Sequence, residues 1–157
     1  MPTVTLRPVT AADFDALFEL ESDVLGADMI AFLPREPGDH EAFTAHWTRI
    51  TSDPDLITRV IEADGVFAGY AVSFVIEGER QIGYWVAREL WGRGIASAAL
   101  RALVTEIEER PLWGSTAFDN LGSQRVLQNA GFVFDRMERG HAPRRGVEID
   151  ENVYRLD

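Results

Sequence analysis

Two hydrophobic patterns alternate along this chain of 157 residues. Runs rich in β-branched and aromatic residues, some of them alternating with polar ones, predict strands, whereas apolar residues that recur every three to four positions predict helices. Strands are predicted at residues 3–8, 56–63, 66–76, 80–86, 115–118, 132–138 and 148–156. Helices are predicted at residues 11–21, between Asp39 and Pro54, at 95–109 and at 123–129.

Turn and cap residues support these elements. Thr10 precedes the first helix, and Asp13 three positions later is the acid of a capping-box pattern. Asp64-Gly65 lies between two strand-like runs and predicts a tight hairpin. Glu77-Gly78-Glu79 predicts a second reversal, and Gly131 predicts a helix C-cap. The three strands between residues 56 and 86 are therefore expected to run antiparallel.

The strand at 80–86, the helix at 95–109 and the strand at 115–118 form a crossover unit. Right-handed crossovers join parallel strands. We therefore expect one α/β domain, residues 1–157, with a mixed, mostly antiparallel sheet, one parallel strand pair and flanking helices. Ligands of such sheets bind at the carboxyl ends of the strands that flank the crossover, so segments 86–97 and 119–123 should border one cleft.

The segment from Val86 to Ser97 ends a strand, contains two glycines and opens a long helical pattern. Gly92 and Gly94 let the backbone adopt positive φ values and let a ligand approach the amides closely. The first amides of the following helix have no internal partner and carry the positive end of the helix dipole, and Arg93 adds a positive charge. A diphosphate fits such a loop, although two glycines between a strand and a helix also occur as a plain tight turn.

Composition narrows the classes of partner. The formal net charge of −11 argues against a broad nucleic-acid-binding surface and favours a cationic substrate. The chain has no cysteine, which excludes disulfides and thiolate sites, and its three histidines lack zinc-ligand spacing, so no metal is expected. Because there is neither a membrane-length apolar run nor a leader pattern, we expect a cytoplasmic protein without a membrane partner.

Three motifs, together with this order of elements, carry a family resemblance. They are Gly83-Tyr-Trp-Val86, Trp91-Gly-Arg-Gly-Ile-Ala96 and Asn120-Leu-Gly-Ser-Gln-Arg-Val-Leu-Gln-Asn-Ala-Gly-Phe132. The chain resembles the GNAT N-acetyltransferase superfamily, and within it the branch whose enzymes acetylate the N-terminal amines of ribosomal proteins. The resemblance covers nearly the whole chain, from Leu6 to Leu156.

The resemblance implies acetyl-CoA as cosubstrate and a primary amine as acceptor. In the family the glycine loop binds the CoA diphosphate, the preceding strand end pairs with the pantetheine arm, and an asparagine and a serine lie close to the cofactor. Carried over to this sequence, the cofactor-binding residues are Trp85, Val86, Trp91, Gly92, Arg93, Gly94, Ile95, Ala96, Ser97, Asn120 and Ser123. Structural roles are the alternative: Trp85 as a sheet aromatic, Asn120 as a helix N-cap and Ser123 as a solvated first-turn residue.

Direct attack of an amine on a thioester needs one group that takes a proton from the amine and one that returns a proton to the thiolate. Many family members have a tyrosine acid at the position of Leu127, and family bases often come from the strand that here holds Arg80 and Gln81. Both groups are therefore missing at the family's usual positions. We expect water and backbone carbonyls to relay the proton, with Ser123 or Tyr84 near the thiolate as the catalytic residues.

The acceptor is expected to bind on the first two helices, their loop and the last hairpin. The acidic candidates for a cationic acceptor are Glu21, Asp23, Asp28, Glu36 and Asp39, each of which also fits a solvated surface. A protein N-terminus is the first acceptor hypothesis, and a small amine (a polyamine, an amino acid or an antibiotic) is the second. A non-catalytic acyl-CoA-binding protein is the third interpretation. A monomer and a homodimer both fit the residues.

Overall fold

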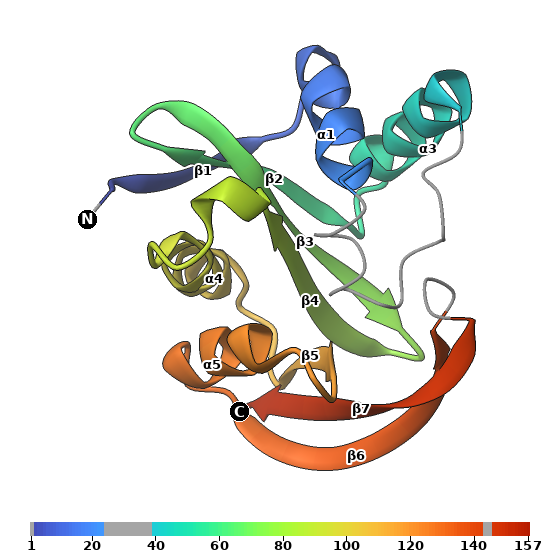
Figure 1. Ribbon diagram of the computed structural model, residues 1–157, viewed down its shortest axis with the longest axis vertical. Helices are drawn as coiled ribbons and strands as arrows, with labels where there is room; N and C mark the ends of the chain where they lie inside the picture. Colours follow the sequence, from blue (N-terminus) through green and yellow to red (C-terminus); the bar gives the residue numbers. More distant parts are fainter. Residues whose placement is uncertain (1, 24–38, 143–145) are drawn as a thin grey trace.

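The computed structural model describes residues 2–23, 39–142 and 146–157, which form a strongly twisted sheet with helices on both faces (Figure 1). The strands are β1 (Val4–Pro8), β2 (Ile57–Ala63), β3 (Val66–Ile76), β4 (Glu79–Val86), β5 (Leu112–Ala117), β6 (Val133–Ala142) and β7 (Val147–Leu156). The α-helices are α1 (Phe14–Glu21), α3 (His40–Ser52), α4 (Ile95–Glu106) and α5 (Leu121–Asn129), and the 3-10 helices are η1 (Ala11–Asp13) and η2 (Arg88–Leu90).

The strand order is β1-β2-β3-β4-β5-β7-β6, and every neighbouring pair is antiparallel except β4 and β5. The predicted mixed sheet with one parallel pair is confirmed. Both predicted hairpin turns are present as well: φ is 52° at Asp64 and 79° at Gly65, and 51° at Glu77 and 80° at Gly78. Two successive positive φ values match the right-handed twist of paired strands, so these turns hold β2, β3 and β4 in register.

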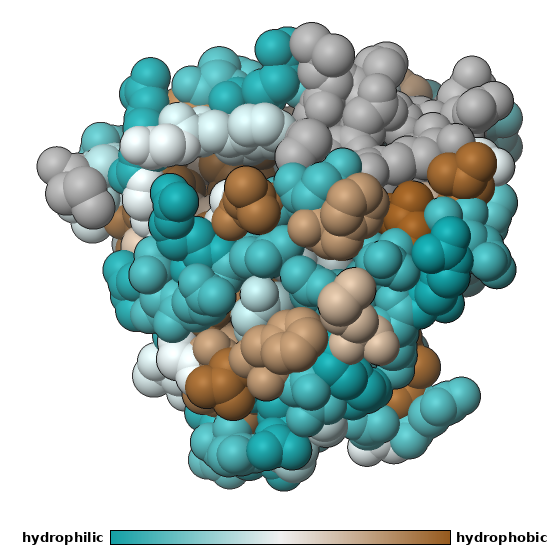
Figure 2. Space-filling model, turned by 60° about the horizontal axis from the view of Figure 1, so that its bottom comes forward, coloured by the Kyte–Doolittle hydropathy of each residue, from teal (hydrophilic) through white to brown (hydrophobic). Residues whose placement is uncertain are grey.

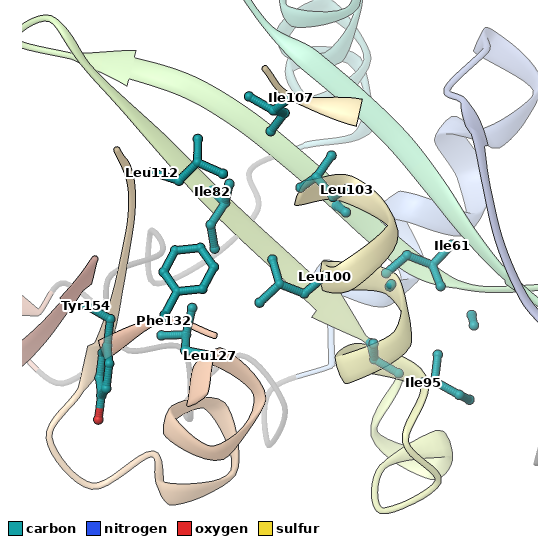
Figure 3. Packing of buried hydrophobic residues seen from close by; sticks show 14 residues of the cluster. Ile61, Ile82, Ile95, Leu100, Leu103, Ile107, Leu112, Leu127, Phe132 and Tyr154 are labelled. Atoms are coloured by element: carbon teal, nitrogen blue, oxygen red, sulfur yellow. The ribbon is translucent and has the colours of Figure 1, made fainter. Parts of the chain in front are cut away.

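Each face of the sheet has its own hydrophobic cluster. α4 and α5 cover one face, where Leu100, Leu103 and Leu127 are at most 1% exposed and pack with Ile82 of β4 (Figure 3). α1 and α3 contribute to a second cluster, which includes Trp47. Full burial of one leucine contributes about 2 kcal/mol, so each cluster is a substantial source of stability.

Strand alternation assigns the side chains of β4 to the two clusters. Tyr84 and Val86 pack with the cluster under α4 and α5, whereas Trp85 between them packs with Tyr70 in the cluster under α1 and α3. Successive side chains of a strand point to opposite faces, so these two clusters lie on opposite sides of the sheet. The structural alternative for Trp85, a sheet aromatic, matches this arrangement, and Tyr84 lies on the other face of the sheet.

β4 and β5 separate soon after they begin. Their parallel pairing consists of Arg80 with Leu112 and Gln81 with Trp113, and no later pair is formed. At the point of separation β5 has Gly114, where a Cβ would lie 2.7 Å from Leu127 Cδ2. A side chain there would collide with α5, so the glycine lets α5 pack closely against β5. The carboxyl ends of β4 and β5 are thus free of each other.

Several element ends differ from the predicted ones. α4 ends at Glu106 instead of residue 109, because Ile107 has extended backbone angles and is 4% exposed in the core. β5 begins at Leu112 instead of residue 115, because Leu112 pairs with both Arg80 and Leu156. α5 begins two residues earlier than residue 123, because its N-cap is Asn120. Burial, strand pairing and side-chain capping determine these ends, and hydrophobic periodicity does not report any of the three.

β6 is an outer strand of the sheet, and in the described part of the chain only β7 pairs with it. Its outward residues include Phe134 and Met137, which are 53% and 55% exposed, beside charged residues. The surface in Figure 2 is mainly hydrophilic, with separate small hydrophobic patches. Charges on an outer strand oppose strand pairing with another chain, whereas exposed apolar residues favour contact with one. Both a monomer and a homodimer therefore stay predictions.

Candidate active site

The glycine loop between η2 and α4 has the backbone geometry that the sequence predicts. Gly92 and Gly94 have φ values of 78° and 77°, in the left-handed region that favours glycine. Gly94 is the N-cap of α4 and supplies no side-chain cap, and the Ala98 amide donates to its carbonyl at 3.1 Å. The amides of Ile95, Ala96 and Ser97 precede this bond, so they belong to the first turn, where helical amides lack an internal partner.

The ends of this loop are held in different ways. Trp91, which is 45% exposed, donates from its indole Nε1 to the Val86 carbonyl at 2.7 Å and so ties the loop to the end of β4. Arg93 is exposed, has no ion pair among the described residues and borders a pocket of about 400 Å³. At the other end Ile95 anchors the helix, with its side chain 2% exposed in the core. The loop therefore offers backbone amides and one arginine.

Tyr84 and Ser123 meet across the gap between β4 and α5. The Tyr84 hydroxyl lies 2.5 Å from Ser123 Oγ and donates to the Ser123 carbonyl at 3.1 Å. Burial raises the pKa of Tyr84 to about 12, although the Ser123 hydrogen bond opposes this shift. Tyr84 is thus neutral at pH 7 and keeps a proton that it can donate.

Asn120 positions Ser123 on α5. Its side-chain Oδ1 accepts from the Ser123 amide at 3.1 Å, which makes it the N-cap of the helix. At the other end of α5, Asn129 donates to Ser97 Oγ at 3.5 Å and links α5 to the first turn of α4. The structure therefore brings the glycine loop, Tyr84, Asn120 and Ser123 to one region, as the sequence predicts.

Trp85 and Val86 are placed differently from the rest of the set. The Trp85 side chain is 2% exposed on the opposite face, and its Nε1 has no hydrogen-bond partner within the described ranges. Only the backbone of Trp85 is available to a ligand on the α4–α5 side. The Val86 carbonyl already accepts the Trp91 indole, so a ligand chain along β4 must share this acceptor or use its neighbours.

The residues at the family's usual acid and base positions have structural roles here. Arg80 donates from Nε and Nη2 to Glu109, each at 3.1 Å, and from Nη1 to the Asp55 carbonyl at 2.8 Å. Leu127 is 1% exposed and fills the space beside Gly114. Neither position can exchange protons with a substrate.

The five acidic candidates for the acceptor have different environments. Asp39 caps α3 by accepting from the Ala42 amide at 2.7 Å, and Asp23 accepts from Arg88 at 3.0 Å. Asp28 and Glu36 lie outside the described residues. Glu21 is the exception to the expectation of a solvated surface, because it is part-buried.

Glu21 accepts from two aromatic donors at the C-terminal end of α1. Trp47 Nε1 lies 3.4 Å from its Oε2, and the Tyr70 hydroxyl lies 3.4 Å from its Oε1. Burial raises the pKa of Glu21, and these two hydrogen bonds oppose the shift. The carboxyl group is therefore part of a mostly aromatic cluster, on the same face of the sheet as Trp85.

Sequence reasoning missed Glu151 on β7, which is half-buried. Burial raises the pKa of its carboxyl group, a hydrogen bond to Ser115 opposes this, and the charge of Glu138 raises it further. A signal was present in the sequence, because Glu151 interrupts the otherwise apolar alternation of Ile149 and Val153. The raised pKa of Glu151, however, depends in part on residues of β5 and β6, and a local sequence pattern cannot show that these strands lie beside it.

The described ranges contain no group of three or more His, Asp or Glu side chains that could hold a metal ion. They also contain no helix of sufficient length and apolar character to cross a membrane.

Comparison with known proteins agrees with this geometry. Residues 3–133 match the model of the acetyltransferase (GNAT) domain family. A Bacillus subtilis (strain 168) protein named "Putative ribosomal N-acetyltransferase YdaF" is 28% identical over 167 residues, which cover 98% of this chain and 90% of that protein. The match to the relative spans nearly all of the chain, and the family match spans well over half of it.

Solved structures share the fold. Mycobacterium smegmatis RimJ, solved with a CoA-disulfide, matches with a TM-score of 0.78 at 25% identity. The match covers 98% of this chain and 81% of the RimJ chain. RimL, a ribosomal L7/L12 alpha-N-protein acetyltransferase solved with coenzyme A, has a TM-score of 0.83 at 23% identity, over 98% of this chain and 93% of its own. With the family match over residues 3–133, the chain belongs to the GNAT acetyltransferase family and is an acetyl-CoA-dependent N-acetyltransferase.

Proposed function

We propose that this enzyme acetylates the α-amine at a protein N-terminus by direct attack of the amine on acetyl-CoA in a ternary complex. The observation that carries the proposal is the separation of β4 and β5 after two residue pairs, with the glycine-capped helix α4 and the Tyr84–Ser123 pair at the open end. The name of the B. subtilis relative supports a protein acceptor.

Acetyl-CoA fits the groups that line the α4–α5 side of this opening. The amides of Gly92 to Ser97 and the Arg93 guanidinium suit a diphosphate, because they are donors at the positive end of the α4 dipole, where the first helical amides lack an internal partner. Beyond Gln81, none of the described strands pairs with β4 on its β5 side, so this edge can pair with the amides of the pantetheine arm. On β5, the buried Thr116 Oγ1 has no hydrogen-bond partner among the described residues.

The remaining assigned residues suit positioning and proton transfer. Trp91 orients the loop, and Asn120 orients Ser123. Tyr84, neutral at pH 7, donates its proton to the departing thiolate, and Ser123 Oγ hydrogen-bonds the tyrosine oxygen as its charge develops. This pair takes the role of the acid that the core residue Leu127 cannot supply.

Charge favours an amine acceptor. The net charge of −11 attracts a cation, and the half-buried carboxyl groups of Glu21 and Glu151 lie on the face of the sheet opposite α4 and α5. An ammonium group that enters from that face meets carboxylates on its way to the opening. The acceptor therefore approaches from one side and acetyl-CoA from the other.

An acceptor screen with free-thiol detection tests this function. Peptides with free N-termini, the same peptides with blocked N-termini, polyamines, amino acids and aminoglycosides are each incubated with acetyl-CoA. We expect thiol release with free N-terminal peptides and none with their blocked forms. Release with small amines alone would contradict the protein acceptor, and thermal stabilisation by acetyl-CoA without any release would indicate an acyl-CoA-binding protein.

A further inference from the structure

Glu151 differs from the other carboxylates of the β6–β7 hairpin and the chain end. Each of the others has a carboxylate oxygen that lies within 3.6 Å of an arginine nitrogen. These paired carboxylates are Asp135, Glu138, Glu148, Asp150 and Asp157. Within the described ranges Glu151 has no cationic partner, and its hydrogen bond is to Ser115. A half-buried carboxylate without a cation costs folding free energy, and such unfavourable groups occur preferentially at functional sites.

The register of β7 places Glu151 at the open end of the β4–β5 separation. It pairs with Ala117, the last residue of β5, and with Glu138 of β6. Its side chain points away from α4 and α5, because Tyr154, three positions along β7, packs in their cluster and therefore faces the other side. Ser115, on the same face of β5, is exposed, so a ligand can reach this place.

The charges around Glu151 make it a better base than an ordinary carboxylate. Burial raises its pKa, the Ser115 hydrogen bond lowers it, and Glu138 across the strand pair raises it. The cations that face this part of the hairpin are already bound: Arg136 to Glu138 at 2.7 Å, and Arg155 to carboxylates at the chain end and on β6. No described cation counters the charge of Glu151, so a substrate ammonium can do so.

We propose that Glu151 is the general base of the reaction and takes a proton from the ammonium group of the acceptor, a role that rests on the function proposed above. The neutral amine then attacks the thioester carbonyl carbon, so that a C–N bond forms and the C–S bond breaks. The thiolate takes the Tyr84 proton. The second proton of the nitrogen returns through water to the Tyr84–Ser123 pair, and Glu151 releases its proton to solvent.

The placement of the two proton-transfer groups supports this role. Glu151 faces one side of the sheet and Tyr84 the other, while the open β4–β5 end lies between them. During direct attack the amine nitrogen approaches the carbonyl carbon from one face of the thioester plane, whereas the sulfur lies in that plane, so the base and the acid act on two different atoms from different directions. Glu151 and Tyr84, on the two faces of the sheet, fit this requirement, and a base at Arg80 or Gln81 is not needed.

Glu151→Gln tests the assignment, because glutamine keeps the shape and can keep the Ser115 hydrogen bond. We expect kcat for a free N-terminal peptide to fall about 100-fold, in the range of general-base catalysis. We also expect the acidic limb of the pH profile of kcat/KM to disappear, while the Kd of acetyl-CoA changes little and Tm does not fall. Glu151→Asp should restore the acidic limb and part of the rate.

Glu138→Gln is the matched control on the neighbouring strand. It removes the negative charge that raises the pKa of Glu151, so the acidic limb should move to lower pH while kcat at pH 8 is kept. A structural role for Glu151 would lower Tm in Glu151→Gln and leave the acidic limb in place.

The outcomes separate the two proposals. If wild type acetylates the peptide and Glu151→Gln keeps its rate and acidic limb, the base assignment is wrong and the proposed function stands. If wild type releases no thiol with any amine of the panel, the proposed function is wrong and the base assignment falls with it.

Discussion

On the face of the sheet that α4 and α5 cover, the polar pair is Tyr84 and Ser123, two hydroxyl groups 2.5 Å apart. On the opposite face the carboxyl groups of Glu21 and Glu151 are part-buried. Hydroxyl groups and backbone amides suit a thioester and a diphosphate, whereas carboxylates suit an ammonium. This difference supports the proposal that the sheet separates the two substrates by charge.

After Glu151, the largest effect is expected from the hydroxyl pair. Tyr84→Phe removes the proton donor and should lower kcat about 30-fold with little change in the KM of the acceptor. Ser123→Ala should lower kcat less, and the double variant should lose no more than Tyr84→Phe alone, because the two act as a unit. Steady-state kinetics check this, with Tyr154→Phe as control, since its hydroxyl bonds Gln124 on the same side. Unchanged activity in both single variants would contradict the role.

The next effect concerns the missing family acid. Leu127→Tyr places a tyrosine where many family members have one, but here the side chain is 1% exposed against Gly114 and Ile82. We expect a loss of about 2 kcal/mol in unfolding free energy from overpacking, without a gain in kcat. Urea unfolding and kinetics measure the two quantities. A stable and faster variant would show that Tyr84 is not the acid.

A smaller effect is expected in the glycine loop, where two glycines form a matched pair. Gly92 and Gly78 have φ values of 78° and 80°, and neither has an atom within 4 Å of an added Cβ. Alanine at either position should cost about 1 kcal/mol of stability because of the left-handed backbone. Only Gly92→Ala should weaken acetyl-CoA binding, about tenfold, as measured by calorimetry. Equal Kd values of acetyl-CoA in the two variants would contradict diphosphate binding at this loop.

The smallest effect concerns Glu21 on the carboxylate face. Burial raises its pKa in the folded state, so the folded protein is stabilised below the unfolded pKa and loses this stability as pH rises through the folded pKa. Glu21→Gln should therefore raise Tm by about 2 °C at pH 7 and hardly change it at pH 4. Thermal unfolding at the two pH values checks the sign. A lower Tm at pH 7 would mean that the carboxylate has a stabilising partner.

Local chemistry made most of the fold and the glycine loop predictable. Asp64-Gly65 and Gly92 to Gly94 are short segments in which backbone preference alone determines the conformation. The end of α4 was not predictable, because Ile107 leaves the helix in order to be buried in the core. In the site, Asn120 and Ser123 lie three residues apart and could be found together. The pKa of Glu151 depends in part on Ser115 and Glu138, which are distant from it in sequence, so its role could not be found from a local pattern.

The short contact between β4 and β5 makes the sheet two half-sheets joined at one end, β1 to β4 and β5 with β7 and β6. A pantetheine arm that pairs with the free edge of β4 would bridge the two half-sheets. Bound acetyl-CoA would then also hold them in a fixed relative position. Amide hydrogen exchange in β4 and β5 should then slow when acetyl-CoA binds and recover once the product CoA departs. The enzyme would be most rigid at the moment when the acetyl group is ready to leave.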